Sequence, residues 1–218
     1  MRIVVTAGPT REPLDPVRYL SNRSSGKMGY AIAEAAIADG HEVVLISGPV
    51  NVSPPRGAKL ISILTADEMF DAVHRHVPNC DALVMCAAVA DYKPATVSEH
   101  KLKKSDAPIS LPLVPTRDIL ASLPKQDRKY FVIGFAAETR DLETNAQKKL
   151  REKNCDMMVA NDVSSAEVGM ESDENAVTIF FRNGESKKIS RTSKNNVAHE
   201  LIKIISNARE NRLTKKSW

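Results

Sequence analysis

The chain opens with RIVVTAG at residues 2–8, continues through a helix-like stretch at 27–39, and returns with HEVVLIS at residues 41–47. Both runs are apolar without alternation, which is typical of strands that are buried on both faces of a sheet. A strand, a helix and a second such strand form a βαβ unit with parallel strands. This stretch predicts an α/β fold.

The same alternation continues along the chain. Helix-like stretches at 66–77 and 143–154 lie among four further apolar runs, KLISIL (59–64), DALVMCAA (81–88), KYFVIGFAA (129–137) and DMMVAND (156–162). We therefore expect a Rossmann-like, three-layer architecture in which a mostly parallel sheet carries helices on both faces.

The C-terminal part differs from this pattern. In NAVTIFFRNGESKKIS (175–190), Asn183-Gly184 lies between two β-rich runs, which predicts an antiparallel hairpin, and a final helix is expected at about 194–209. We expect a single domain at 1–218, with a core at about 1–165 and the hairpin and helix at about 166–210. Residues 92–115 hold KLKK and four prolines and read as a long loop of the kind that often forms a lid.

Composition limits the classes of partner. The net charge of +4 and pI near 8.9 suit anionic small molecules as well as nucleic acid, but 5% aromatic residues argue against a base-stacking surface. The N-terminal apolar run is too short for a signal peptide or a membrane span. Cys80, Cys86 and Cys155 lack CxxC spacing and fit buried thiols in a reducing cytosol. We expect a cytoplasmic protein without nucleic-acid or membrane partners.

Ligands in such folds bind at the carboxyl ends of the parallel strands. Ser25-Gly26-Lys27 resembles the end of a Walker phosphate loop, but that loop needs a glycine at Ser21 and a Ser or Thr at Met28. An anion site at the start of the following helix stays open, and a plain serine cap is the alternative.

Redox chemistry is disfavoured by two absences in the sequence. The first turn reads GPTREP at residues 8–13 instead of GxGxxG, and none of the tyrosines is followed by a lysine four places later. The Gly-rich pyrophosphate fingerprint and the Tyr/Lys pair of a short-chain reductase are therefore missing.

Five motifs at the strand ends, taken together, resemble the phosphopantothenoylcysteine synthetase family, the phosphopantothenate–cysteine ligases of coenzyme A biosynthesis. They are TAGPTREPLDPVRYLSNRSSGKMG (6–29), CAAVADYKP (86–94), KLKK (101–104), GFAAET (134–139) and ANDV (160–163). They occur in order and cover nearly the whole chain.

The resemblance implies a ligase that joins 4′-phosphopantothenate and L-cysteine into 4′-phosphopantothenoylcysteine. CTP activates the carboxylate as an acyl-cytidylate and releases pyrophosphate, and the cysteine amine then expels CMP. An ATP-using version of the reaction stays open, as does an NAD(P)-binding reductase or a regulatory nucleotide-binding module on the same layout. A nucleic-acid binder would rest on pI and KLKK alone.

The resemblance also implies catalytic roles for three residues. Asn22 would donate to the acyl carbonyl oxygen in the second half-reaction, and Arg18 would bind an anionic substrate group. Lys101 would neutralise the triphosphate. The alternatives are a turn-forming asparagine, an exposed surface arginine and a solvated basic run.

The nucleotide site that the resemblance implies is larger. Asp91 would also contact Mg²⁺, its alternative being an ordinary loop carboxylate, and no flavin is expected. Phe135 would face the base, although by itself it reads as core. The full set of nucleotide-binding residues is Gly8, Ser24, Ser25, Gly26, Met85, Cys86, Ala87, Asp91, Lys101, Thr116, Arg117, Asp118, Ile119, Phe135, Lys149 and Lys153.

Two positions depart from the family pattern, and two kinds of partner are implied. Lys93 stands where arginine is frequent, and Arg117 stands where many members have proline. The family is dimeric, so we expect a homodimer to which the region after the core sheet contributes. Many bacterial members follow a flavin-dependent decarboxylase, and none precedes Met1 here. We expect a stand-alone ligase or the ligase half of the bifunctional protein, with a separate decarboxylase as a candidate partner.

Overall fold

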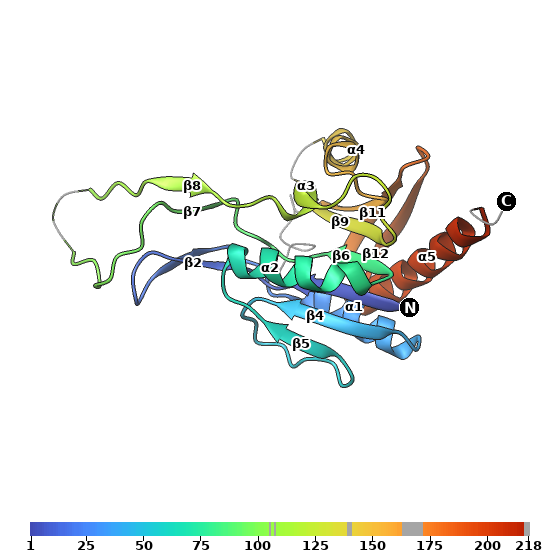
Figure 1. Cartoon of the computed structure of the whole chain (residues 1–218), viewed down its shortest axis with the longest axis horizontal. Coiled ribbons are helices and arrows are strands. Elements are labelled where there is room, and N and C mark those ends of the chain that lie inside the picture. The colour runs from blue at the N-terminus through green and yellow to red at the C-terminus, as the bar shows by residue number, and fades with distance from the viewer. Residues whose placement is uncertain (105, 107, 139–140, 163–171, 216–218) are drawn as a thin grey trace.

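The computed structural model describes residues 1–104, 106, 108–138, 141–162 and 172–215 (Figure 1). Its main sheet has eight strands, namely β1 (Arg2–Ala7), β4 (Glu42–Ser47), β5 (Lys59–Ser62), β6 (Ala82–Met85), β9 (Phe131–Glu138), β10 (Met157–Asp162), β11 (Glu174–Phe181) and β12 (Ser186–Ser193). Their order across the sheet is β12-β11-β10-β9-β6-β1-β4-β5.

The six predicted apolar runs form the parallel part of this sheet. β5, β4, β1, β6, β9 and β10 pair in parallel, which confirms the mostly parallel α/β architecture. After β1 the chain builds β4 and β5 on one side and then crosses to β6 on the other side of β1. The boundary between β1 and β6 is therefore the topological switch point, where α/β folds bind ligands.

The predicted hairpin is confirmed. β11 pairs antiparallel with both β10 and β12. At the turn, the N–H of Phe181 donates to the carbonyl of Glu185 at 3.0 Å, and Gly184 has a φ of +88°. Asn183-Gly184 is typical of such turns because asparagine and glycine tolerate positive φ.

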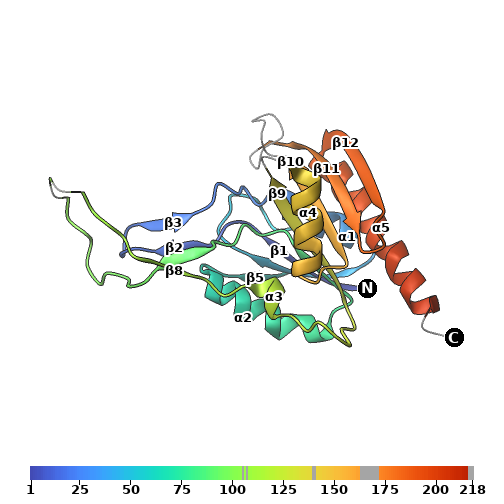
Figure 2. The same ribbon diagram turned by 90° about the horizontal axis from the view of Figure 1, so that it is seen from above.

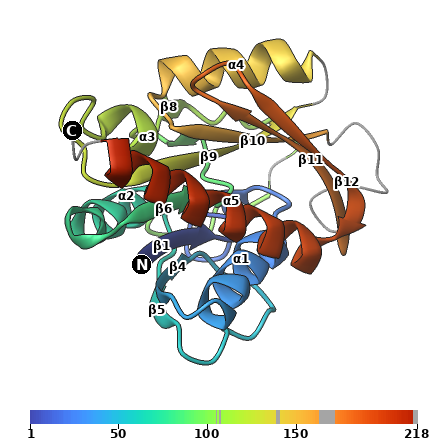
Figure 3. The ribbon, with the colours of Figure 1, turned by 90° about the vertical axis from the view of Figure 1, so that its right-hand side faces the viewer.

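Helices cover both faces of the sheet. They are α1 (Lys27–Ala38), α2 (Ala66–His76), α3 (Ile119–Ser122), α4 (Leu142–Glu152) and α5 (Lys194–Lys215), with a short 3-10 turn η1 (Val77–Asn79) after α2. α1 and α5 pack together on one face, where Ile32 and Leu201 belong to one apolar core (Figure 3). α2, α3 and α4 cover the other face, where Met69 and Leu150 belong to the second core. All four predicted helices are confirmed, and α5 extends beyond the expected end at 209.

Two narrow ribbons extend from the carboxyl edge of the sheet toward the same side (Figures 1 and 2). One consists of β2 (Arg11–Pro13) and β3 (Tyr19–Ser21), and the other of β7 (Tyr92–Pro94) and β8 (Leu113–Pro115). The interpretation of 92–115 as a plain loop is therefore wrong at both of its ends, because these ends pair with each other. We call residues 92–115 the arm.

No helix in the described part of the chain is both long enough and apolar enough to cross a lipid bilayer.

Candidate functional site

A cavity of about 310 Å³ lies at the carboxyl ends of the parallel strands, between the start of α1 and the segment that follows β6. Eight of the residues that the sequence singled out line it: Asn22, Ser24, Ser25, Gly26, Cys86, Ala87, Asp91 and Phe135. The other lining residues are Lys27, Met28, Gly29, Ala88, Val89, Ala136, Ala137, Asn161, Asn175 and Lys194.

The backbone around this cavity is held by threonine side chains. The hydroxyl oxygen of the fully buried Thr6 accepts hydrogen bonds from the N–H groups of Cys86 and Ala87, both at 3.1 Å. The hydroxyl of Thr10 accepts from the N–H of Ala90 at 3.0 Å. The segments that follow β1 and β6 are therefore bound to each other at the switch point.

Asn22 lies at the mouth of the cavity, directly after β3. Its side-chain amide donates to the carbonyl of Ala88 at 3.1 Å and to that of Val89 at 3.4 Å. These contacts hold the amide group beside the segment after β6. Because an amide has two N–H groups, donation to a carbonyl oxygen of a bound substrate requires the amide to release one of these two bonds, of which the bond to Val89 is the longer.

The first turn of α1 forms one wall. The helix starts after Gly26, which has a φ of +76°, and a Cβ atom there would lie 2.5 Å from Cγ1 of Val50. No side chain caps the helix among the described residues, and Ser24 Oγ instead accepts from the N–H of Gly26 at 3.3 Å. The plain serine cap is therefore wrong. The partial positive charge of the helix start favours an anion in the cavity.

Two lysines, Lys27 and Lys194, also line the cavity. Lys27 forms an ion pair with Asp173 at 2.6 Å, and Lys194 is 5% exposed. Burial lowers the pKa of Lys194 below its ordinary value, and the charge of Lys27 lowers this pKa further. Neither lysine was predicted as a site residue.

Two asparagines, Asn161 and Asn175, line the cavity together with these lysines. Asn175 is 2% exposed, and its Oδ1 accepts from the N–H of Ala176 at 3.0 Å. The Oδ1 atom of Asn161 is buried and has no hydrogen-bond partner among the described residues. An unpaired acceptor in a cavity wall can accept a hydrogen bond from a bound molecule.

Cys86 lines the cavity but is unsuited to nucleophilic chemistry. Burial raises the pKa of its thiol to about 12, so the thiol is protonated near neutral pH. Only the thiolate is strongly nucleophilic. The contribution of Cys86 is therefore its shape and its backbone.

Arg18 and Lys101 lie outside the cavity lining. Arg18 donates through Nε to Asp15 Oδ2 at 2.9 Å and also donates to the carbonyl of Leu102, while Asp15 Oδ2 accepts from the N–H of Leu102 at 3.1 Å. The turn between β2 and β3 is thus bound to the arm beside the exposed Lys101. Arg18 anchors the residue next to the predicted catalytic lysine.

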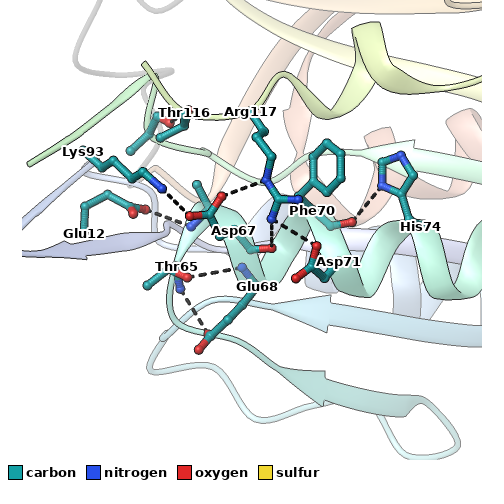
Figure 4. A network of polar contacts seen from close by, with 12 residues as sticks. Glu12, Thr65, Asp67, Glu68, Phe70, Asp71, His74, Lys93, Thr116 and Arg117 are labelled. Carbon is teal, nitrogen blue, oxygen red and sulfur yellow. Dashed lines mark hydrogen bonds and ion pairs between the residues drawn. The ribbon is translucent and has the colours of Figure 1, made fainter. Parts of the chain in front are cut away.

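Arg117 contacts α2 and not the cavity (Figure 4). Its guanidinium lies 3.9 Å from the ring centroid of Phe70, and it forms ion pairs with Asp67 at 2.9 Å and Asp71 at 3.0 Å. Lys93 also forms an ion pair with Asp67 (Figure 4). The two positions that depart from the family pattern therefore meet at one aspartate of α2.

The remaining predicted residues lie outside the cavity lining. Thr116 donates to the carbonyl of Ala90 at 2.6 Å, which holds the base of the arm against the segment after β6. Asp118 caps α3 and forms an ion pair with Lys153, and this arrangement lowers the pKa of Asp118 against the opposing effect of burial. Three others are in the body of the fold or at its surface: Met85 and Ile119 are buried, and Lys149 is exposed on α4.

Gly8 lies directly beside the cavity wall. Its carbonyl accepts from the N–H of Ala88 at 2.9 Å, and a Cβ atom at Gly26 would lie 3.4 Å from the Cα of Gly8.

The described residues contain no cluster of three or more His, Cys, Asp or Glu side chains that could hold a metal ion. Asp91 supplies a single carboxylate to the cavity lining.

Sequence reasoning missed Asn161, Asn175 and Lys194, which line the cavity. Asn161 belongs to the ANDV motif, so the rule that chemistry follows strand ends could have identified it. Asn175 and Lys194 come from beyond the parallel core: the pairing of β11 with β10 brings Asn175 to the site, and the packing of α5 against α1 brings Lys194.

Comparisons with known proteins identify the family and the fold of this chain. The family model of the DNA/pantothenate metabolism flavoprotein C-terminal domain matches residues 1–208. The chain is 47% identical over 204 residues to the coenzyme A biosynthesis bifunctional protein CoaBC of Bacillus subtilis (strain 168), which covers 93% of this chain and 50% of that protein. It is 46% identical over 189 residues to the protein of the same name from Escherichia coli (strain K12), covering 85% and 47%.

A solved structure shares the fold. The crystal structure of the C-terminal domain of coenzyme A biosynthesis bifunctional protein CoaBC superposes with a TM-score of 0.83 at 43% sequence identity, covering 96% of each chain. The present chain spans about half the length of the curated relatives it matches.

Proposed function

Because the chain belongs to the family of the DNA/pantothenate metabolism flavoprotein C-terminal domain, we propose that it is a phosphopantothenate–cysteine ligase of coenzyme A biosynthesis. The membership confirms the resemblance of the sequence motifs. The activity is proposed for residues 1–218 acting as one domain, using CTP through an acyl-cytidylate.

One observation carries this proposal. Asn22, the start of α1 and Asp91 line a single cavity at the switch point of the sheet. A nucleotide-dependent ligase needs an anion site, a donor for an acyl oxygen and a carboxylate for a metal–phosphate complex in one place. The curated relatives, named as coenzyme A biosynthesis bifunctional proteins, support the choice of substrate.

In the first half-reaction, the carboxylate oxygen of 4′-phosphopantothenate attacks the α-phosphorus of CTP and pyrophosphate leaves. The positive start of α1 stabilises the negative charge of the phosphates, and Lys101 on the arm approaches from outside. Asp91 would hold Mg²⁺, which neutralises triphosphate charge when bound. The step activates the carboxylate, which is otherwise a poor electrophile.

In the second half-reaction, the amine of cysteine attacks the acyl carbon and forms a tetrahedral species with a negatively charged oxygen. The attacking nitrogen loses a proton to solvent, and collapse of that species expels CMP and leaves the amide. A preorganised donor aimed at the oxygen typically contributes about 10²- to 10³-fold in rate. Asn22 is the candidate for this donor, since its amide is held beside the cavity by backbone carbonyls.

We also propose a homodimer, which forms through the two ribbons in place of the expected region after the core sheet. Within the described residues, eight of the ten exposed large hydrophobic side chains belong to the β2–β3 ribbon or the arm: Val17, Tyr19, Tyr92, Val97, Ile109, Leu111, Leu113 and Val114. Exposed apolar side chains that are concentrated in a few segments are candidates for a protein interface. The outer strand β12 carries exposed Lys187, Lys188 and Arg191, and such charged edges disfavour pairing.

The proposal further places the protein in the cytosol, since its three cysteines are free thiols, as is typical of a reducing compartment. A separate decarboxylase that converts the product is a candidate partner.

Pyrophosphate release tests the function. Purified protein is incubated with Mg²⁺, 4′-phosphopantothenate and either CTP or ATP, each with and without cysteine. We expect sustained release with CTP only when cysteine is present, and one equivalent per site without it. Sustained release with ATP and cysteine, but not with CTP and cysteine, would identify the ATP-using version. No release in any combination would overturn the proposal.

A further inference from the structure

The first turn of α2 contacts both ribbons (Figure 4). The N–H of Ala66, the first residue of the helix, donates to Glu12 Oε1 of β2 at 2.9 Å, and Glu12 is 2% exposed. The N–H of Arg11 donates to the carbonyl of Leu64 at 2.8 Å. A buried carboxylate needs such a donor, and the positive start of a helix favours its charge. The β2–β3 ribbon is therefore fixed to the start of α2.

The arm is bound to the same turn near both of its ends. Asp67 Oδ2 accepts from Nζ of Lys93 on β7, and Asp67 Oδ1 accepts from Nε of Arg117, two residues after β8, at 2.9 Å. The hydrogen bond from Lys93 lowers the pKa of Asp67 below its ordinary value against the opposing effect of burial, and the hydrogen bond from Arg117 lowers it further. One ionised carboxylate on α2 thus holds both ends of the arm.

This anchor has a fixed geometry. An isolated surface ion pair contributes little to stability, because water and salt screen it. The guanidinium of Arg117, however, also donates to the carbonyl of Asp67 at 3.2 Å and to Asp71 at 3.0 Å, and lies 3.9 Å from the ring centroid of Phe70. Several contacts therefore hold Arg117 in one orientation on α2.

The two ribbons also hold each other on both sides of Lys101. The N–H of Ser98 donates to the carbonyl of Leu14 at 3.0 Å, and the N–H of Leu102 donates to Asp15 Oδ2 at 3.1 Å. Lys101 lies between these two bonds along the arm. Because both ribbons are bound to the first turn of α2, that turn sets the place of Lys101 relative to the sheet.

We propose that Asp67 is a positioning residue of the ligase, which fixes both ends of the arm to α2 and thereby sets where Lys101 approaches the triphosphate. This inference rests on the proposed function. Asp67 lies outside the cavity lining, so it acts through the arm and not by contact with substrate. Without its carboxylate, the arm stays attached through the β2–β3 ribbon, but a smaller fraction of molecules holds Lys101 in its productive place.

A double-mutant cycle tests whether Asp67 acts through Lys101. Rapid-quench measurements give the rates of pyrophosphate formation and of amide formation for wild type, Asp67→Asn, Asp67→Glu, Lys101→Gln and the double variant of Asp67→Asn with Lys101→Gln. Glu143→Gln is the control, because Glu143 is an exposed acidic residue in the first turn of α4 and its replacement also removes a negative charge from a helix start. Circular dichroism spectra check that each variant is folded.

We expect Asp67→Asn to slow pyrophosphate formation about fivefold and to leave amide formation within about twofold of wild type. In the Lys101→Gln background the same change costs less than about twofold, because the group that Asp67 positions is already absent. Asp67→Glu restores a carboxylate and recovers most of the rate, and Glu143→Gln behaves like wild type. Unchanged pyrophosphate formation in Asp67→Asn, or an equal loss in both backgrounds, would overturn the inference.

Failure of the proposed function is recognised separately, by wild-type protein that releases no pyrophosphate with any nucleotide. Backbone hydrogen exchange at Ser98 and Leu102 then decides the inference. We expect exchange at least about fivefold faster in Asp67→Asn than in wild type or Glu143→Gln, because the arm opens more often. Equal exchange overturns the inference. If Asp67→Asn does not fold, Arg117→Met, which removes the guanidinium from the same ion pair, replaces it in both experiments.

Discussion

The side-chain amide of Asn22 lies 3.1 Å from the carbonyl oxygen of Ala88 and donates a hydrogen bond to it. Asn22 follows the β2–β3 ribbon and Ala88 follows β6, so the bond joins two segments that are distant in sequence. The amide group is thereby held at the mouth of the cavity. Its donor character is needed for this contact, because a carboxylate at the same position would face carbonyl oxygens.

Replacing Asn22 by aspartate should separate the two half-reactions. For Asn22→Asp we expect amide formation to fall by about 10²-fold, because a carboxylate repels the developing oxyanion, while pyrophosphate formation without cysteine continues. Rapid-quench measurement of both steps checks this. Asn51→Asp, on an exposed loop, is the control for the added charge. Equal loss of both steps would exclude the assigned role.

Neutralising Lys101 should affect activation instead. For Lys101→Gln we expect pyrophosphate formation to fall by at least about tenfold, because the positive charge that offsets the triphosphate is removed. The exposed Lys103, on the same arm, provides the control variant Lys103→Gln. Unchanged pyrophosphate formation in Lys101→Gln would rule out its participation.

Cys86 should be dispensable as a chemical group. Burial raises the pKa of its thiol to about 12, so the thiolate is scarce at neutral pH. We expect Cys86→Ala to keep kcat/KM within about threefold of wild type, because no step needs a thiolate. A loss of two orders of magnitude in steady-state assays would show that the thiol takes part.

The Asp15–Arg18 pair, which holds the arm, should make the free energy of unfolding depend on pH in acid. Burial alone would raise the pKa of Asp15, but hydrogen bonds from Val17, Leu102 and Arg18 lower it below its ordinary value. A lowered folded-state pKa stabilises the protein above the unfolded-state value of about 3.9, and this contribution is lost as pH falls toward the folded-state value.

Thermal unfolding of wild type and Asp15→Asn between pH 3 and pH 7 tests this linkage. We expect the variant to have the lower melting temperature at pH 7 and the difference to shrink below about pH 4. Asp39→Asn is the control at an exposed aspartate. A difference that stays constant with pH would contradict the assignment.

The proposed dimer can be tested at matched apolar positions. Val114 on the arm is 38% exposed and Leu60 on β5 is 39% exposed. We expect Val114→Asp to convert the dimer to monomer in light scattering after size exclusion, because it places a charge in an apolar interface, and Leu60→Asp to leave the dimer intact. A monomeric wild type, or a dimer that survives Val114→Asp, would exclude this interface.

The sequence alone predicted the strands of the main sheet, the four longer helices and eight of the eighteen residues that line the cavity. Buried parallel strands read as apolar runs and helices show a 3.6-residue period, and both signals are local. The residues that follow β1 and β6 could be identified because chain order places them at strand ends. This rule identified the segments that contain Asn22, Gly26 and Asp91, and the resemblance to the family then singled out these residues together with Phe135.

Only the tertiary structure decided which of the remaining residues meet. Lys194 reaches the cavity because α5 packs beside α1, whereas Arg117 is held on α2 by two aspartates. Such contacts depend on strand order, register and the direction of each side chain, which no short stretch of sequence encodes. Local periodicity specifies the elements, and the burial of their apolar faces against one another brings distant polar groups together.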